Sequence, residues 1–174
     1  MANTVEIKAP KTHKFFFATQ ISLRVMAFAS TLAAACIMLT NKQTAVVFDI
    51  QVDARYTYLP AFMFFGFANV IACVFSIVAL ILTFILGNNP EHYLYIFLHD
   101  LIMSELLMAG CAAATAVGYI GKYGNTHTGW TPVCDHFAKF CNRGIAAVLL
   151  SFLSIAFYLI LTIISAKKWR QIQL

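Results

Sequence analysis

Four long apolar runs constrain this chain more than any other feature of its sequence. They cover residues 18–40, 59–86, 93–120 and 144–166, approximately. A helix needs about 20 residues, at a rise of about 1.5 Å each, to cross the hydrocarbon core of a bilayer, so each run is long enough. A transmembrane β-barrel would show alternating segments of about ten residues, and the sequence has none. The pattern predicts an all-α integral membrane protein, a bundle of four transmembrane helices.

The composition argues against the main soluble classes. Of the 174 residues, 61% are hydrophobic and only 11% are charged. A soluble domain is usually about 25% charged, so this chain has too little charge for the surface of a soluble globular enzyme. The apolar content is also too high for a disordered chain. The net charge of +5 comes from basic residues that mostly flank the apolar runs, which indicates topology signals and contacts with lipid headgroups.

The connections between the runs predict the topology. Residues 87–92 offer Gly87 to end one helix, then Asn89 and Pro90 as the N-cap and first residue of the next, so the second and third helices should form a tight antiparallel hairpin. The two longer connections, residues 41–58 and 121–143, must then lie on the same side of the membrane.

Basic residues and cysteines favour cytoplasmic termini. The tails, residues 1–17 and 167–174, carry six basic residues and the long loops carry five, which is a weak positive-inside signal. Cys134 and Cys141 both lie in the second long loop, and paired loop cysteines suit an oxidising compartment. We therefore expect cytoplasmic tails and two outer loops. A less favoured alternative is lipoprotein-like cleavage at residues 33–36, which would leave three spans and an outer C-terminus.

Three ionisable residues fall within the expected spans, and a charge in the middle of a bilayer costs about 2.5–3.5 kcal/mol on insertion scales. Arg24 and Asp100 lie at a similar depth of about 10 Å from the cytoplasmic side, so an ion pair between the first and third helices is one of two equally weighted hypotheses. The alternative is that Arg24 extends to the headgroups while Asp100 binds water or is protonated. Glu105 should face elsewhere, and a protonated Glu105 bonded to Asn69 is the expected arrangement, with a proton or ion path as the alternative.

Small residues recur at four-residue spacing in the third run, at Gly110, Ala114 and Gly118. Such faces let transmembrane helices approach closely, so we expect them to pack within the bundle, with contacts between subunits as the alternative. The second run contains bulky residues that we expect to face lipid, namely Phe62, Phe64, Phe65 and Phe67.

The second outer loop holds Cys134 and Cys141, seven residues apart. On one straight helix they would be about 10.5 Å apart, so a disulfide requires a turn or a helix break between them. A structural disulfide is the expected reading. Metal binding with His136 and a catalytic thiol pair are less favoured alternatives, because the spacing matches neither a standard zinc pattern nor C-x-x-C.

The order of several motifs along the chain resembles one family. These are Arg24, the segment Tyr56-x-Tyr58-x-Pro60-Ala61-Phe62, Asn69, Ala72-Cys73, Asp100, Trp130-x-x-x-Cys134 and Phe140-Cys141. The chain resembles the plant CASP-like proteins, which are related to the Casparian strip membrane domain proteins and, more distantly, to MARVEL-domain proteins. Residues 41–58 lack the stretch that marks true Casparian strip members, so the resemblance is to the broader CASP-like branch.

The resemblance implies a MARVEL-like four-helix fold and a scaffold in the plasma membrane that forms stable platforms and guides local cell-wall modification. It also implies that Arg24 and Asp100 are the paired family residues and that Trp130 contributes to outer-loop contacts. We expect a non-enzymatic oligomer with no cofactor and no metal. Its expected partners are copies of itself, related CASP-like proteins, secreted wall enzymes and membrane lipids, but not nucleic acid. The alternatives are a small ion or proton channel or transporter using Asp100 and Glu105, and a thiol oxidoreductase using Cys134 and Cys141.

Overall fold

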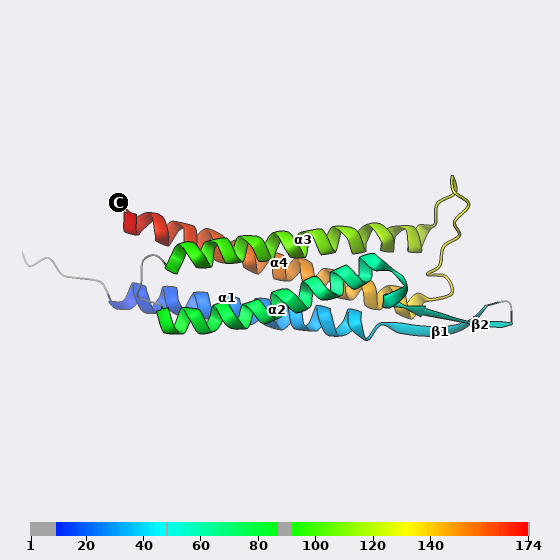
Figure 1. Cartoon of the computed structure of the whole chain (residues 1–174), viewed down its shortest axis with the longest axis horizontal. Coiled ribbons are helices and arrows are strands. Elements are labelled where there is room, and N and C mark those ends of the chain that lie inside the picture. Colours follow the sequence, from blue (N-terminus) through cyan, green and yellow to red (C-terminus); the bar gives the residue numbers. More distant parts are fainter. Residues whose placement is uncertain (1–9, 48, 87–91, 174) are drawn as a thin grey trace, which may run out of the picture.

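The computed structural model describes residues 10–47, 49–86 and 92–173, and its main elements are four long helices (Figure 1). They are α1 (Pro10–Leu39), α2 (Pro60–Leu86), α3 (His92–Tyr123) and α4 (Ala138–Gln173). Each helix contains one of the apolar runs and is long and apolar enough to cross a membrane. The expected all-α, four-span fold class is confirmed. The predicted turn at residues 87–91 lies outside the described residues.

Three of the four helices, α1, α3 and α4, extend beyond the apolar runs. α4 begins at Ala138, inside the segment expected to be an outer loop, and continues to Gln173, beyond the expected span. α1 likewise begins at Pro10, before the expected first span. A helix satisfies its own backbone hydrogen bonds, so it can continue past the hydrocarbon into polar surroundings at little cost, and apolar content alone does not mark its ends.

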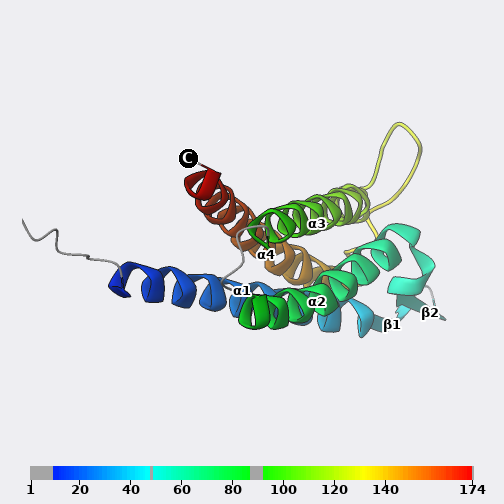
Figure 2. The same ribbon diagram turned by 60° about the vertical axis from the view of Figure 1, so that its left-hand side comes forward.

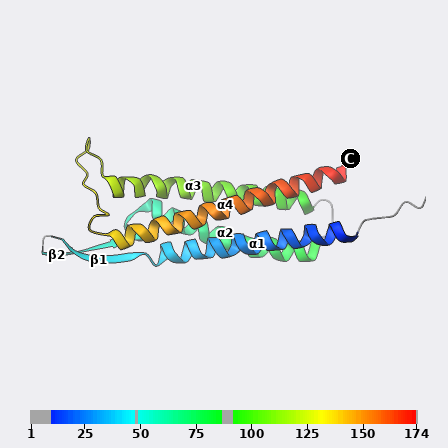
Figure 3. The same cartoon turned by 180° about the vertical axis from the view of Figure 1, so that it is seen from behind.

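The four helices form a closed ring. α1 packs against α2, α2 against α3, α3 against α4, and α4 against α1. The pair α1 and α2 lies on one side of the bundle, with α3 and α4 on the other (Figure 2), and α4 runs between α3 and α1 when the molecule is seen from behind (Figure 3). α1 is therefore diagonally opposite α3, and α2 is opposite α4. α1 begins and α4 ends at the same end of the bundle (Figure 1).

The first long connection folds into a β-hairpin, which the sequence pattern did not predict. Strands β1 (Lys42–Val47) and β2 (Ile50–Arg55) pair antiparallel, with Lys42 opposite Arg55 and Val47 opposite Ile50. A 3₁₀ turn, η1 (Tyr56–Tyr58), then leads into α2. The hairpin projects beyond the helices at the end away from the termini (Figure 1). Polar and apolar residues alternate over only six residues in β2 and do not alternate in β1, so the sequence signal for a hairpin is weak beside the apolar runs.

The α2–α3 contact is built from small side chains. Gly110 is buried against α2, and a β-carbon placed on it would lie 3.4 Å from the Ala68 β-carbon and 3.4 Å from the Phe65 α-carbon. Ala114 is also buried, at 1% exposure. Gly118 is only partly buried, and a β-carbon there would meet nothing within 4 Å, so it does not take part in the expected packing face.

The expectation that four phenylalanines of α2 face lipid holds for only two of them. Phe64 and Phe67 are exposed on the outside of the bundle, whereas Phe62 and Phe65 are buried. Phe65 lies where Gly110 leaves space on α3, and the ring of Phe62 packs against Phe140 of α4, with centroids 6.0 Å apart. The missing side chain of Gly110 provides the space that Phe65 occupies.

The contrast between the two glycines yields a prediction. Gly110→Leu should destabilise the protein by about 1–3 kcal/mol or more, because the added side chain separates α2 from α3. Gly118→Leu is the matched control on the same helix and should be tolerated, since open space surrounds that position. Thermal unfolding in detergent micelles measures both. Equal destabilisation by the two substitutions would contradict the packing described here.

Candidate functional site

The structure brings Arg24 and Asp100 together in the interior of the bundle. Arg24 Nη1 donates to Asp100 Oδ1 at 2.9 Å, and Arg24 Nη2 donates to Asp100 Oδ2 at 2.8 Å. The two side chains are only 1% and 0% exposed. This two-point geometry is the strongest form of an arginine–carboxylate contact, because both oxygens and two nitrogens are satisfied at once. The pair has a direct contact, so Arg24 does not extend to the headgroups.

This ion pair crosses the centre of the bundle, because α1 and α3 are diagonally opposite in the ring. His99 adds a third group, with Nδ1 lying 3.1 Å from Asp100 Oδ1. Its ring also packs against Phe75 of α2, with centroids 6.0 Å apart. The carboxylate of Asp100 therefore holds α1 and α3 together, while the adjacent histidine contacts α2.

The other diagonal is crossed by a tyrosine that the sequence reasoning missed. The Tyr158 hydroxyl of α4 is hydrogen-bonded to Ser76 Oγ of α2, and it lies 3.1 Å from the carbonyl oxygen of Ala72 on the same helix. Tyr158 is only 1% exposed. The available signal was a single tyrosine in an apolar run, because a buried phenol needs a hydrogen-bond partner.

Two further polar contacts join α1 to α4. Gln20 Nε2 donates to Ser165 Oγ at 3.3 Å, and Ser154 Oγ donates to Ser30 Oγ at 2.7 Å. All four side chains are buried. In lipid, helices gain little from burying apolar surface against each other, so such hydrogen bonds and close packing set which faces meet. Together with the two diagonal contacts, these bonds form a polar core, which we define as Gln20, Arg24, Ser30, Ser76, Asp100, Ser154, Tyr158 and Ser165.

Glu105 and Asn69 do not form the expected hydrogen bond. Asn69 is fully buried, and its Nδ2 donates to the carbonyl oxygen of Phe65 in its own helix at 2.9 Å. Glu105 is exposed on the outside of the bundle. The prediction matched the two residues by depth, and depth does not determine which way a side chain faces. Asp100 is buried in the interior of the bundle, whereas Glu105 is on its outside. The two acids therefore do not line the common path that the channel alternative required.

The second outer loop is tied to the bundle by a disulfide between Cys134 and Cys141. α4 begins between the two cysteines, at Ala138, so the break that the spacing required is present, and the α-carbons are 5.8 Å apart. The amides of Val133 and Cys134 both donate to the carbonyl oxygen of Gly121 near the end of α3. The loop is thereby fastened to both α3 and α4.

Trp130 lies in this loop, with its backbone against the residues that directly follow the end of α3. Its backbone pairs with Asn125 in an isolated β-bridge, and its side chain is 59% exposed. Gly124 has a φ of 68°, and a β-carbon there would lie 2.4 Å from the Trp130 carbonyl oxygen, so only glycine suits this turn. The backbone is ordered by these contacts while the indole remains available to a partner.

The hairpin is fastened to the start of α4. Asn41 Nδ2 donates to the Phe140 carbonyl oxygen at 2.9 Å, and the Phe140 amide donates to Gln43 Oε1 at 2.7 Å. On the outer face of the hairpin, Thr44 and Arg55 both donate to Asp53. The Thr44 hydrogen bond, followed by that of Arg55, lowers the pKa of the Asp53 carboxyl, and Asp53 in turn raises the pKa of Arg55. Across residues 10–47, 49–86 and 92–173, no group of three potential metal ligands was found.

These features define a class: a four-helix membrane protein with a polar core, whose hairpin and disulfide loop are both fastened to the start of α4. Residues 14–157 match the Casparian strip membrane protein domain, and the chain belongs to that family. It is 51% identical over 165 residues to CASP-like protein 1F1 of Ricinus communis, which covers 93% of this chain and 92% of that protein. It is also 47% identical over 166 residues to CASP-like protein 1F2 of Populus trichocarpa, covering 94% and 92%. No solved structure matches the chain.

The buried ion pair yields a second prediction. Arg24→Met or Asp100→Asn alone should cost about 3–5 kcal/mol of stability, because each leaves an uncompensated charge in the interior. The double variant should cost less than the sum of the two. A double-mutant cycle on unfolding in micelles measures the coupling. Additivity within about 0.5 kcal/mol would mean that the two side chains do not interact.

The exposed pair of Arg55 and Asp53 provides the control for that cycle. Its members are 53% and 33% exposed, and exposed ion pairs contribute little to stability. The corresponding variants Arg55→Met and Asp53→Asn should leave the unfolding transition almost unchanged.

The disulfide yields a third prediction. Peptide mapping without reduction should recover residues Cys134 and Cys141 linked within one chain. Cys134→Ser should lower stability by roughly 2.5 kcal/mol, since the bond closes a short loop in the unfolded chain. Cys36→Ser removes an exposed free cysteine and serves as the control, with no expected loss. Two free thiols in freshly purified protein would contradict the prediction.

Proposed function

We propose that this protein is a non-enzymatic scaffold of the plasma membrane that self-associates into platforms and organises local modification of the cell wall. Its partners are copies of itself, related CASP-like proteins, membrane lipids and secreted wall-modifying enzymes. Membership of the Casparian strip membrane protein family supports a scaffold role in a membrane.

The observation that carries this proposal is that both long connections are fixed to the bundle at the end where α4 begins. Both outer segments are fastened to the start of α4: the hairpin through Asn41 and Gln43, and the second loop through the disulfide. Beyond these anchors they present exposed side chains, among them Val46, Ile50 and Trp130. A fixed surface of this kind offers a partner binding sites that lose little conformational entropy on contact.

Two features support an orientation with both termini in the cytoplasm. The described start and end of the chain lie at one end of the bundle, and the disulfide loop is at the other (Figure 1). Disulfides persist in oxidising compartments such as the cell exterior, and the basic cluster at the end of α4, Lys167, Lys168 and Arg170, suits the cytoplasmic face. The hairpin and second loop then face the cell wall.

The interior of the bundle favours the scaffold over the channel alternative. Asp100 is engaged by two nitrogens of Arg24, and the Tyr158 hydroxyl is engaged by α2. Groups committed to such contacts hold helices together, and ion transfer through them would require breaking the contacts that define the fold. Cys134 and Cys141, which the oxidoreductase alternative would use, are joined in a disulfide that fastens the loop to the start of α4. This arrangement favours a structural role for the two cysteines.

The fourth prediction tests self-association. Native mass measurement in nanodiscs should find multiples of the 19.3 kDa chain, and liposomes that contain the protein should conduct protons and ions no faster than empty liposomes. The control is the Arg24→Met variant, which should lose the larger species because its bundle is weakened. A strictly monomeric protein over a wide range of protein-to-lipid ratios would overturn the proposal, as would ion flux above background.

A further inference from the structure

Glu105 is placed where a membrane protein rarely keeps an acid. It lies on α3, twelve residues after Tyr93 and eighteen before Tyr123, and it is exposed on the outside of the bundle. Twelve residues of helix correspond to about 18 Å, so the side chain lies near the middle of a hydrocarbon core about 30 Å thick. A glutamate side chain is too short to reach the headgroups from there, unlike lysine or arginine near a helix end.

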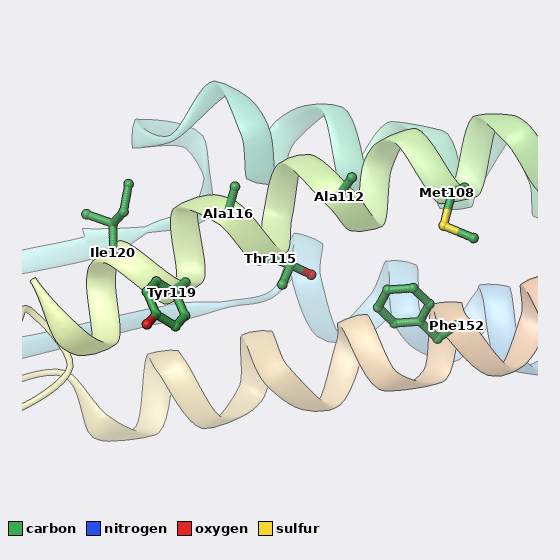
Figure 4. A pocket seen from close by; sticks show the side chains of 7 residues that line it. All are labelled: Met108, Ala112, Thr115, Ala116, Tyr119, Ile120 and Phe152. Carbon is green, nitrogen blue, oxygen red and sulfur yellow. The ribbon is translucent and has the colours of Figure 1, made fainter.

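From Glu105 toward Tyr123, one exposed strip of α3 carries small side chains, although Ile102 and Met108 next to Glu105 are large and exposed. Ala109, Ala112 and Ala116 follow Glu105 at helical spacing, and all three are exposed. Ala112 and Ala116 also line a hollow of about 590 Å³ between α3 and α4, together with Thr115 and Phe152 (Figure 4). The outer surface of α2 is the reverse, since it is covered by large side chains such as Phe67 and Val74. Small side chains on α3 allow another helix backbone to approach closely.

The hydrogen-bonding chemistry of Glu105 indicates the partner. The exposed lysines and arginines of the described chain lie toward the ends of the helices or in the outer segments, so no cation of a neighbouring copy is available at the depth of Glu105. Hydrocarbon strongly disfavours the charged form of a carboxyl, so hydrogen bonds rather than a counter-charge decide which partner suits it. A neutral carboxyl has one donor and an acceptor, so it is complementary to a second carboxyl.

Symmetry brings two such carboxyls together. All copies in one membrane share the same orientation, and a two-fold axis along the membrane normal places any residue on the axis opposite itself at the same depth. Two copies of Glu105 related in this way form a pair of reciprocal hydrogen bonds, and both groups leave the lipid. No other ionisable side chain among the described residues of the four spans is exposed at this depth.

We propose that this face of α3, where Glu105 is followed along the helix by Ala109, Ala112 and Ala116, is the contact between two copies of the chain, held by hydrogen bonds between their neutral Glu105 carboxyls. The inference rests on the self-association proposed above and names the surface that performs it. Hydrogen-bond complementarity selects a second copy of the chain over a lipid, whose acyl chains offer Glu105 no partner.

The fifth prediction uses two substitutions at the same position. Glu105→Leu removes both the donor and the acceptor and should weaken dimerisation in nanodiscs or liposomes by about tenfold or more, whereas Glu105→Gln retains both and should stay within about threefold of the wild type. Val78→Leu, on the exposed surface of α2, is the control and should have no effect. Circular dichroism and the intact Cys134–Cys141 disulfide verify that each variant is folded.

Cysteine cross-linking locates the contact directly. In a Cys36→Ser background, Ala112→Cys should cross-link between copies on mild oxidation, and Val74→Cys on α2 should not. Cross-linking at Val74 in preference to Ala112, or Glu105→Leu dimerising as well as the wild type, would overturn this inference while leaving the scaffold proposal intact. A wild-type protein that stays monomeric would overturn both.

Discussion

The bundle is organised around an ion pair that joins two helices lying diagonally across its centre. Arg24 and Asp100 are each almost fully buried, and neither charge is stable in hydrocarbon without the other. Their contact fixes the depth of α1 relative to α3, and it requires α2 and α4 to close around it. Tyr158 and Ser76 connect those two helices across the other diagonal. Since hydrophobic burial does not drive helices together inside lipid, these directional contacts decide which of the many apolar faces turn inward.

The polar residues of the spans fall into two groups with different roles. Those of the polar core find their partners within one chain and therefore specify the bundle. Glu105 has no such partner among the described residues and faces outward, so it is exposed to contact with other molecules in the membrane. The end of the bundle that carries the hairpin and the disulfide loop contains neither group of residues. There the hairpin and the disulfide loop are fixed to α4 and present exposed side chains on the side opposite the described start and end of the chain.

Much of the architecture could be predicted from residue order, and the limits have physical causes. The apolar runs predicted the four helices. Matched depth left the pairing of Arg24 with Asp100 as one of two possibilities, and the family resemblance favoured the pair. Depth failed for Glu105 and Asn69, where a neutral amide could bond to its own backbone instead. The contacts of Gln20, Ser30 and Tyr158 were missed because a neutral hydroxyl or amide costs less free energy in hydrocarbon than a charge does. These residues therefore gave no strong signal in the sequence. The hairpin was missed because its strands are short.

The sequence by itself determined that the chain crosses a membrane as four helices, since only helices and closed β-barrels satisfy their backbone within hydrocarbon and the sequence lacks the alternation of a barrel. It also determined that the two loop cysteines could pair only across a break in the chain's course, as they do around the start of α4. The tertiary structure decided which face of each helix turns inward. It buried Phe62 and Phe65 while exposing Phe64 and Phe67, and it turned Glu105 away from Asn69. These choices depend on the rotation of each helix about its own axis, which an almost uniformly apolar sequence leaves open until polar contacts between helices settle it.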